Sequence, residues 1–205
     1  MVDHDILLKK LKLYKVDQTA FSWFSSYLNS RFQQTHVSGV NSELKPVISG
    51  VPQGSILGPL LFLIFINDLP LATVHSMTDI FADDTTLSVH SSSSKHVIDS
   101  LAFDLINVNS WCDLNRMYIN VAKTKLMIIS SKQNANRIQH SLPSIELNNE
   151  KIYSSHEKLL GITLDKTLAW EKQVDIVLKK CNSLLYLLSR IKSFLSISQY
   201  EKNIC

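Results

Sequence analysis

The segment from Thr78 to Val89 constrains the fold of this chain more than any other. Apolar and β-branched residues alternate with polar ones on both sides of an Asp83-Asp84 pair, and a period of two predicts two short strands. Because aspartate tolerates turn conformations, we expect a hairpin that closes at Asp83-Asp84. Adjacent carboxylates repel each other unless a cation lies between them, and hard oxygen ligands on a rigid tip suit Mg²⁺. A solvated turn is the commoner explanation of such a pair, so a metal site depends on the rest of the chain.

The composition is that of a globular protein. The chain has 205 residues, 45% of them hydrophobic and 19% charged, which excludes a disordered chain. Its net charge of +3 is too small to indicate nucleic-acid binding by itself. Cys112, Cys181 and Cys205 form no CxxC motif and predict neither a disulfide framework nor a zinc site. The longest apolar run, Leu60 to Ile66, is too short to cross a bilayer, and no signal peptide is recognised, so we expect an intracellular protein.

Hydrophobic spacing predicts an alternation of helices and short extended segments. Helices are expected at residues 1–14, 19–28, 59–67, 98–112 and 174–195. Hairpins are expected at residues 32–48, with the turn at 38–42, and at 145–152; strands are expected at 126–130 and 159–164, and an exposed loop at 133–140. The helix at 59–67 is apolar nearly all round and should be buried in the centre of the domain. The aromatic residues of the helix at 19–28 should belong to the core, namely Phe21, Trp23, Phe24 and Tyr27. The apolar stripe of the last helix needs a partner, which ordinary packing on the domain could supply.

A loop rich in glycine precedes the helix at 59–67. It runs from Gly50 to Pro59 and holds three of the five glycines of the chain. Glycine lets a backbone approach a ligand closely, and Pro59 is suited to the start of a helix. The loop is therefore either a simple connection that ends before the helix or a ligand-facing loop mounted on a rigid element.

Three segments together resemble reverse transcriptases. They are GVPQGSILGPLLF at residues 50–62, INDLP at residues 66–70 and FADDT at residues 81–85. The match is to the non-long-terminal-repeat (LINE-type, Jockey-like) retrotransposon group. Supporting matches lie at residues 4–11, 27–31, 111, 120–124 and 160–165, in the expected order, so the resemblance covers nearly the whole chain.

The resemblance implies an α+β fold, namely a polymerase palm in which an antiparallel sheet packs on helices. Residues 1–166 would form the palm with partial fingers, and residues 167–205 would form the start of a helical thumb. Family members copy RNA into DNA from a primer end with two Mg²⁺ ions, for which Mn²⁺ is an alternative. The implied partners are an RNA template, a DNA primer and deoxynucleoside triphosphates, with no membrane; the oligomeric state is left open.

The resemblance also assigns roles to individual residues. Asp83 and Asp84 would be catalytic and bind the metal ions, and Lys123 would meet the departing pyrophosphate, although a solvated turn lysine remains the alternative for it. Leu160 and Gly161 would grip the primer backbone. The pocket for the nucleotide and template would be lined by Pro52, Gln53, Gly54, Ser55, Phe81 and Ala82. The basic outer face of the last helix would follow nucleic-acid phosphates.

One departure from the family pattern bears on activity. Family members carry a further metal-bridging aspartate in a strand just before the segment that matches His4 to Leu11, and the chain begins after that position. Asp3 and Asp5 are expected at a helix start instead. Two carboxylates hold two ions poorly, so we expect a fragment with little or no polymerase activity by itself. The alternatives are a non-catalytic nucleic-acid-binding or scaffold module and a relic of an element. All of these rest on Asp83 and Asp84 facing a common cleft with Gln53 and Gly54.

Overall fold

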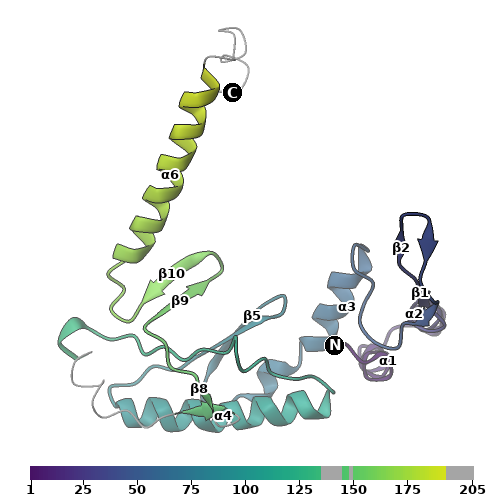
Figure 1. Ribbon diagram of the computed structural model, residues 1–205. Coiled ribbons are helices and arrows are strands. Elements are labelled where there is room, and N and C mark those ends of the chain that lie inside the picture. The colour runs from purple at the N-terminus through teal and green to yellow at the C-terminus, as the bar shows by residue number, and fades with distance from the viewer. Residues whose placement is uncertain (135–144, 148–149, 193–205) are drawn as a thin grey trace. The chain divides into compact units, whose positions relative to one another are not determined.

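The computed structural model describes residues 1–134, 145–147 and 150–192, which divide into two compact units, residues 1–120 and 121–205 (Figure 1). The α+β class expected from the sequence is confirmed, although the described strands pair as separate two-stranded antiparallel ladders and not as one sheet. The first unit contains α1 (His4–Leu13), α2 (Gln18–Leu28), β1 (Phe32–Gln33), β2 (His36–Val37), β3 (Val40–Asn41), β4 (Lys45–Pro46), α3 (Leu57–Ile66), the 3-10 helix η1 (Leu69–Ala72), β5 (Met77–Phe81), β6 (Asp84–Ser88) and α4 (Ser94–Leu114).

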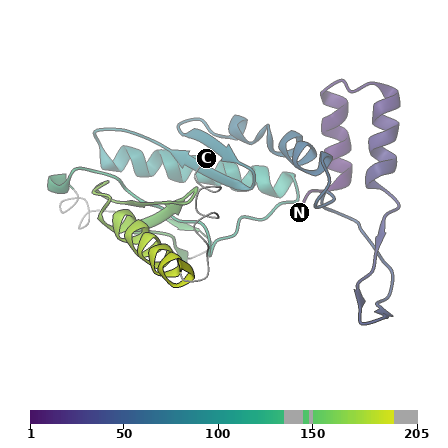
Figure 2. The same ribbon diagram turned by 90° about the horizontal axis from the view of Figure 1, so that it is seen from above.

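Aspartates start the first two helices. The Asp3 carboxylate accepts a hydrogen bond from the Ile6 N–H, and the Asp17 carboxylate accepts from the N–H groups of Thr19 and Ala20. These bonds satisfy amides that have no partner within the helix. The two helices lie side by side (Figure 2). The expected helices at 1–14 and 19–28 are confirmed. The core assignment of Trp23 is wrong, because this residue is 52% exposed, whereas Phe21, Phe24 and Tyr27 are partly buried and pack against the core cluster that contains Leu28.

The hairpin expected at residues 32–48 is confirmed. Strand β1 pairs with β4, and β2 pairs with β3 closer to the turn. The turn contains Ser38 and Gly39, which have φ angles of 49° and 84°. This pair of left-handed residues matches the twist of a two-residue hairpin turn.

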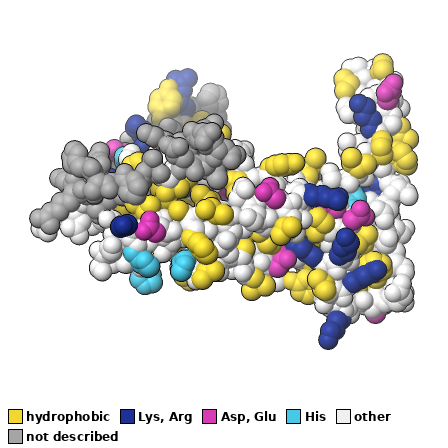
Figure 3. Space-filling model, turned by 90° about the horizontal axis from the view of Figure 1, so that it is seen from below, with side chains coloured by type: hydrophobic (Ala, Val, Ile, Leu, Met, Phe, Trp, Pro, Cys, Tyr) yellow, Lys and Arg dark blue, Asp and Glu magenta, His cyan; other side chains and the backbone are white. Residues whose placement is uncertain are grey.

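Helix α3 is buried along one side only. Leu61, Phe65 and Ile66 are buried, whereas Leu60 and Leu63 are about half exposed, at 49% and 50%. The expectation that the whole helix is buried is therefore wrong. Among the described residues of the first unit, α1 packs against one face of α3, and the opposite face is exposed. Figure 3 shows hydrophobic side chains exposed in many places on the face that it presents.

A buried lysine lies where two apolar clusters meet in the first unit. One cluster contains Leu7, Leu11, Leu28, Leu61 and Phe65 with Val2, and the other contains Ile66, Leu69, Val108, Trp111 and Cys112. The Lys10 ammonium donates to the Phe65 carbonyl and to the Asp68 carboxylate, both at 2.6 Å. It also lies 4.7 Å from the centre of the Phe65 ring and 4.8 Å from that of Trp111. A cation at this place complements the negative C-terminal end of α3.

A second buried charge holds the segment that leads into β5. Asp104 of α4 is fully buried, and its carboxylate accepts hydrogen bonds from the N–H groups of Val74, His75 and Ser76 at 2.9, 2.9 and 2.6 Å. Burial raises the pKa of this carboxyl, and the hydrogen bonds from residues 74–76 lower it by more, so its pKa lies below the ordinary value. Strand β5 begins at Met77, so Asp104 fixes the origin of the hairpin β5–β6.

In its described residues, the second unit contains two small hairpins and a long helix. Strands β7 (Glu146–Leu147) and β8 (Glu150–Lys151) pair, as do β9 (His156–Leu159) and β10 (Ile162–Asp165), and α6 (Glu171–Ile191) follows. The hairpin expected at 145–152 is confirmed, although its Asn148-Asn149 turn lies outside the described residues. Most of the loop expected at 133–140 also lies outside them.

Two expected strands have a different form. Residues 159–164 are not one strand: Leu159 ends β9, residues 162–164 belong to β10, and Leu160 and Gly161, with φ angles of 46° and 91°, form the two-residue turn between them. Residues 126–130 do not form a strand; Leu126 makes a single bridge to Tyr153, and the Ser130 N–H donates to the Lys166 carbonyl. Both errors arose because period-two patterning does not show where the chain reverses or which segment pairs with it.

Helix α6 confirms the last expected helix in its described part, residues 171–191. None of these residues is buried, and the apolar stripe that includes Val174, Leu184 and Leu188 is more than half exposed. The described residues contain no helix that is both long and apolar enough to cross a membrane.

Replacing the buried lysine tests the junction between the two clusters. Lys10→Met keeps most of the aliphatic volume but leaves the Phe65 carbonyl without its donor, so we expect the free energy of unfolding to fall by about 1–2 kcal/mol. Asp68 is partly exposed and can be hydrated, which keeps the effect below that of a fully buried ion pair. Urea unfolding measures the change, and Lys9→Met on the exposed side of α1 should have little effect.

Replacing Asp104 tests the anchor of β5. Asp104→Asn places an amide group against backbone N–H donors, so the free energy of unfolding should fall by about 2 kcal/mol near neutral pH. Because the folded pKa is depressed, this contribution is present above the unfolded value, 3.8, and is lost as the pH falls from there through the folded pKa. The difference between parent and variant should therefore narrow in acid. Asp99→Asn, an exposed site on the same helix, is the control; a difference that stays constant down to about pH 2 would contradict the assignment.

Candidate nucleotide and metal site

The acidic pair lies at the tip of the hairpin β5–β6. Phe81 pairs with Asp84, so the two turn residues are Ala82 and Asp83. The sequence placed the turn one residue later, at Asp83-Asp84, and that detail is wrong. Ala82 has a φ angle of 54°, a conformation that costs energy for a residue with a Cβ atom. The first turn position therefore takes the left-handed backbone, and Asp84 becomes the first residue of β6.

The register assigns the hairpin side chains to two faces. Ile80 and Leu87 pack against the cluster that contains Val108, Trp111 and Cys112. On the opposite face lie Asp79 and Phe81, together with Asp84, which pairs with Phe81. Asp79 and Asp84 are therefore diagonal neighbours on an exposed face. Sequence reasoning missed Asp79, although the alternation along the strand carried the signal.

The donor set fits a hard divalent cation only in part. Asp83 in the turn and Asp84 at the start of β6 are exposed carboxylates, which is the ligand type that Mg²⁺ prefers. Among the residues that the structure describes, no group of three or more His, Cys, Asp or Glu side chains is placed to hold a metal ion. Asp83 and Asp84 could thus contribute to binding one ion, while two ions require further oxygen ligands.

The loop before α3 owes its glycines to two different constraints. Gly54 has a φ angle of 78° and no atom within 4 Å of the place that a Cβ would take, so its backbone conformation is what requires glycine. Gly58 lies inside the helix, where a Cβ would come 2.6 Å from the Pro52 carbonyl oxygen. Gly58 therefore lets the loop fold onto the first turn of α3, a reason internal to the protein.

Hydrogen bonds hold the shape of this loop. The Ser55 hydroxyl donates to the Pro52 carbonyl at 2.8 Å and accepts from the Gly58 N–H at 2.9 Å. Ser55 thus serves one of the free amides at the start of α3, because Ile56, the residue at the cap, offers no side-chain acceptor. Gln53 and Gly54 are exposed at the loop tip, whereas Pro52 and Ser55 are half-buried and engaged with each other.

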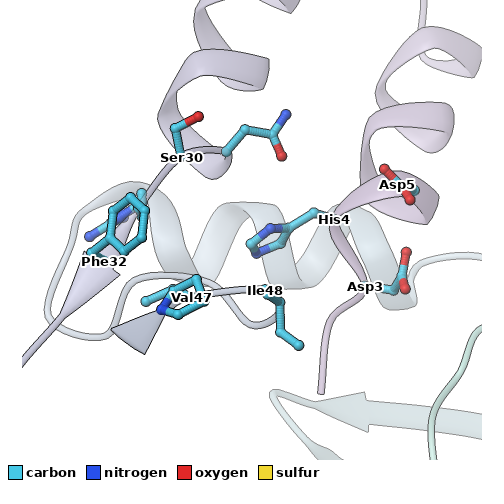
Figure 4. Close-up of a pocket in the computed structure, with 10 residues that line it drawn as sticks. Asp3, His4, Asp5, Ser30, Phe32, Val47 and Ile48 are labelled. Carbon is cyan, nitrogen blue, oxygen red and sulfur yellow. The ribbon is translucent and has the colours of Figure 1, made fainter. Parts of the chain in front are cut away.

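The N-terminal residues clamp the start of the same loop. The Gly50 N–H donates to the Val2 carbonyl at 2.6 Å, and His4 Nε2 donates to the Gly50 carbonyl at 2.7 Å. Beside this clamp lies a cavity of about 260 Å³, lined by residues of α1, the end of α2 and β4 (Figure 4). Asp3 lines this cavity. Burial raises the pKa of its carboxyl, but the hydrogen bonds from the Ile6 N–H and the Arg116 guanidinium lower it by more, so the pKa lies below the ordinary value.

The predicted site residues are not all joined by contacts. No hydrogen bond or ion pair connects Asp83 or Asp84 with residues 52–55 in the described chain, so their common cleft stays a prediction. Phe81 and Ala82 lie beside the acidic pair, as the sequence requires. Lys123 ends the turn at residues 121–123, and Leu160 and Gly161 form the tip of β9–β10; all three are exposed and belong to the second unit. Their roles also stay predictions.

Asp104 is the residue that sequence reasoning could least have found. It lies within the apolar repeat Ile98, Leu101, Leu105, Val108 as an ordinary polar position of a helix. Its importance comes from the loop at residues 74–76, which folds onto it from a distance of almost thirty positions. No local pattern reports such a contact.

Comparison with known proteins places the chain in a family. The model of the family described as reverse transcriptase (RNA-dependent DNA polymerase) matches residues 1–184. The chain is 31% identical over 157 residues to the RNA-directed DNA polymerase from mobile element jockey of Drosophila melanogaster, covering 73% of this chain and 16% of that protein. It is 30% identical over 187 residues to the probable RNA-directed DNA polymerase from transposon BS of the same fly, covering 87% of this chain and 20% of that protein.

A third relative is the probable RNA-directed DNA polymerase from transposon X-element of Drosophila melanogaster, 28% identical over 170 residues. The chain spans a fifth or less of the length of these relatives, from 16% to 20%. The resemblance to Jockey-like reverse transcriptases that the motifs indicated is thus confirmed over most of the sequence. The chain belongs to the reverse transcriptase (RNA-dependent DNA polymerase) family.

Proposed function

We propose that this chain supplies the palm of an RNA-directed DNA polymerase, which extends a DNA primer along an RNA template by nucleotidyl transfer. The observation that carries the proposal is the exposed Asp83-Asp84 pair on a hairpin tip whose base is held by the apolar cluster of α4 and by Asp104. Family membership over residues 1–184 gives this pair its chemical meaning.

The proposed reaction divides its work between ions and side chains. Divalent ions, Mg²⁺ or alternatively Mn²⁺, would supply a lowered pKa of the primer 3′-hydroxyl and neutralisation of charge on the triphosphate. Asp83 and Asp84 are the residues that would hold such an ion. The left-handed Ala82 is what turns Asp83 away from the ladder and into the turn.

The nucleotide and template are proposed to lie against the loop before α3. Gln53 and Gly54 are exposed at its tip, and Gly54 has no neighbour within 4 Å of the Cβ position, so a ligand can approach its backbone. Pro52 and Ser55 keep the loop rigid through their mutual hydrogen bond. Phe81 and Ala82 would complete this surface from the hairpin side, and deoxynucleoside triphosphates would be the bound substrate.

The remaining elements fit the same division of labour. We propose residues 1–166 as the palm with partial fingers and residues 167–205 as the start of the thumb. In this arrangement Lys123 meets the departing pyrophosphate as a point charge, and Leu160-Gly161 contacts the primer backbone. The exposed tip of the β9–β10 hairpin supports this role for Leu160, whose side chain is 57% exposed.

The carboxylate set limits what the chain does alone. Two ions need several carboxylates, and Asp83 and Asp84 are the two that the family pattern supplies here. We therefore expect weak metal binding and little synthesis from the chain by itself. A non-catalytic nucleic-acid-binding module is the second candidate, and the experiments below separate the two.

Binding of Mn²⁺ tests the metal site without requiring catalysis. The chain should bind Mn²⁺ with a dissociation constant on the order of 1 mM, because one or two carboxylates without substrate phosphates hold such ions weakly. Paramagnetic broadening of amide NMR signals should centre on residues 82–85. Asp83→Asn should remove it, and Asp99→Asn should leave it unchanged. Broadening that Asp83→Asn does not alter would show that the ion binds elsewhere.

Primer extension tests the proposed function directly. On an RNA template with a DNA primer, deoxynucleoside triphosphates and Mg²⁺, we expect the parent chain to give only slow extension. Asp83→Ala should abolish this slow extension. Template–primer binding is measured in parallel by fluorescence anisotropy. Robust synthesis that survives Asp83→Ala would refute the site. Binding without any synthesis in the parent, unchanged by Asp83→Ala, would favour the non-catalytic module.

A further inference from the structure

A six-residue joint, Asp165 to Trp170, connects β10 to α6. One oxygen of the Asp165 carboxylate, Oδ1, accepts hydrogen bonds from the Thr167 N–H at 2.9 Å, the Thr167 hydroxyl at 2.7 Å and the Ala169 N–H at 3.1 Å. The other oxygen, Oδ2, accepts from the Trp170 N–H at 3.0 Å. A single carboxylate therefore accepts hydrogen bonds from three residues of the joint, Thr167, Ala169 and Trp170.

The joint holds two residues in an unfavourable backbone conformation. Leu168 has a φ angle of 52° and Trp170 has a φ angle of 65°, and neither is glycine. Such left-handed residues persist only where the surrounding contacts determine them. The Leu168 N–H donates to the backbone carbonyl of Asp165 at 3.0 Å. The N–H groups of the next two residues, Ala169 and Trp170, both donate to the Asp165 carboxylate, which therefore helps to hold this left-handed segment.

The direction of α6 is decided at its first turns. None of the described residues of α6 is buried, so side packing along the helix does not determine its direction. Beyond the joint, the Gln173 side-chain oxygen accepts a hydrogen bond from the Thr163 N–H at 2.9 Å, which ties the first turn of α6 to β10. The Trp170 side chain makes no capping hydrogen bond at the start of α6. The Asp165 carboxylate holds this end instead, through the Trp170 N–H.

We propose that Asp165 is a positioning residue that locks hairpin β9–β10 and helix α6 into one rigid body, so that both contact the same nucleic-acid duplex at a fixed separation. The ligand follows from charge and rests on the proposed function: α6 carries Lys172, Lys179, Lys180 and Arg190, which suit phosphates. The hairpin contributes its exposed tip, Leu160-Gly161. A duplex held at both places would thus meet two contact surfaces whose separation does not change.

The protonation state of Asp165 favours a permanent joint over a switch. Hydrogen bonds from the Thr167 hydroxyl and from the backbone N–H groups of Thr167, Ala169 and Trp170 hold the pKa of this carboxyl far below its ordinary value. The carboxylate therefore stays ionised at every pH at which such a protein works. Protonation of Asp165 therefore does not loosen the joint in that range.

Distance measurement by electron paramagnetic resonance tests the lock without nucleic acid or catalysis. Spin labels are attached to the exposed native Cys181 on α6 and to Leu160→Cys at the hairpin tip, in the full chain with Cys112→Ala and Cys205→Ser. The parent should give one narrow distribution of label-to-label distances. Asp165→Ala should give a broad or divided distribution. A distribution that stays narrow and unshifted in Asp165→Ala would overturn the proposal.

Two further variants separate positioning from general loss of structure. Asp165→Asn keeps one carbonyl oxygen for Thr167 and Ala169 but turns an amide group toward the Trp170 N–H, so the distribution should broaden less than in Asp165→Ala. Asp175→Asn removes an acidic group of α6 that lies outside the joint and should leave the distribution unchanged. Far-ultraviolet circular dichroism checks that α6 is intact; if Asp165→Ala loses its helix, the comparison of Asp165→Asn with Asp175→Asn decides, and equal distributions in those two would overturn the lock.

Binding of a template–primer duplex tests the consequence for the ligand. Asp165→Ala should weaken binding about tenfold, because two surfaces that no longer keep a fixed separation lose their joint action on one ligand. Asp165→Asn should fall between Asp165→Ala and the parent. A widened distance distribution with unchanged duplex binding would leave the lock in place and refute the shared duplex. Failure of the parent to bind any duplex would contradict the proposed function and not the lock.

Discussion

The first unit depends on one buried ammonium group. Lys10 comes from α1, yet its partners are the last turn of α3, the Asp68 carboxylate and the ring of Trp111 in α4. Three helices are thereby held at a point where two apolar clusters meet. A hydrophobic residue could fill the same space, but it could not serve the free carbonyl at the end of α3. The hydrogen bonds of Lys10 therefore specify how the helices are oriented at this point, which hydrophobic burial does not do because it is non-directional.

From this junction a chain of contacts leads to the acidic hairpin. Trp111 helps to fix α4, and α4 presents the buried Asp104 to the backbone of Val74, His75 and Ser76. Strand β5 starts directly after these residues, and its inward side chain Ile80 returns to the cluster around Trp111. The exposed carboxylates of Asp83 and Asp84 are thus carried on a support that is buried and hydrogen-bonded at its base. Rigidity at the base is what a ligand-binding tip needs.

Local patterns predicted the elements well where the physical cause was local. Helices α1, α2, α4 and α6 followed from apolar spacing, and the hairpin at 77–88 followed from its period of two. The turn at its tip was misplaced by one residue, because Ala82 adopts a left-handed conformation that its type does not favour. Residues 126–130 look like a strand, but pairing needs a partner in register, and the structure supplies only a single bridge there.

The amino-acid sequence by itself determined the family, the acidic pair, the glycine-bearing loop and the succession of helices and hairpins, because motifs and periodicity are properties of neighbouring residues. Tertiary structure alone decided the buried roles of Lys10 and Asp104, the exposure of one side of α3 and the hydrogen bonds that surround Asp165. It also decided why Gly58 is glycine, through the carbonyl of Pro52. Each of these depends on which distant group completes a hydrogen bond or fills a space, and only the folded chain brings those groups together.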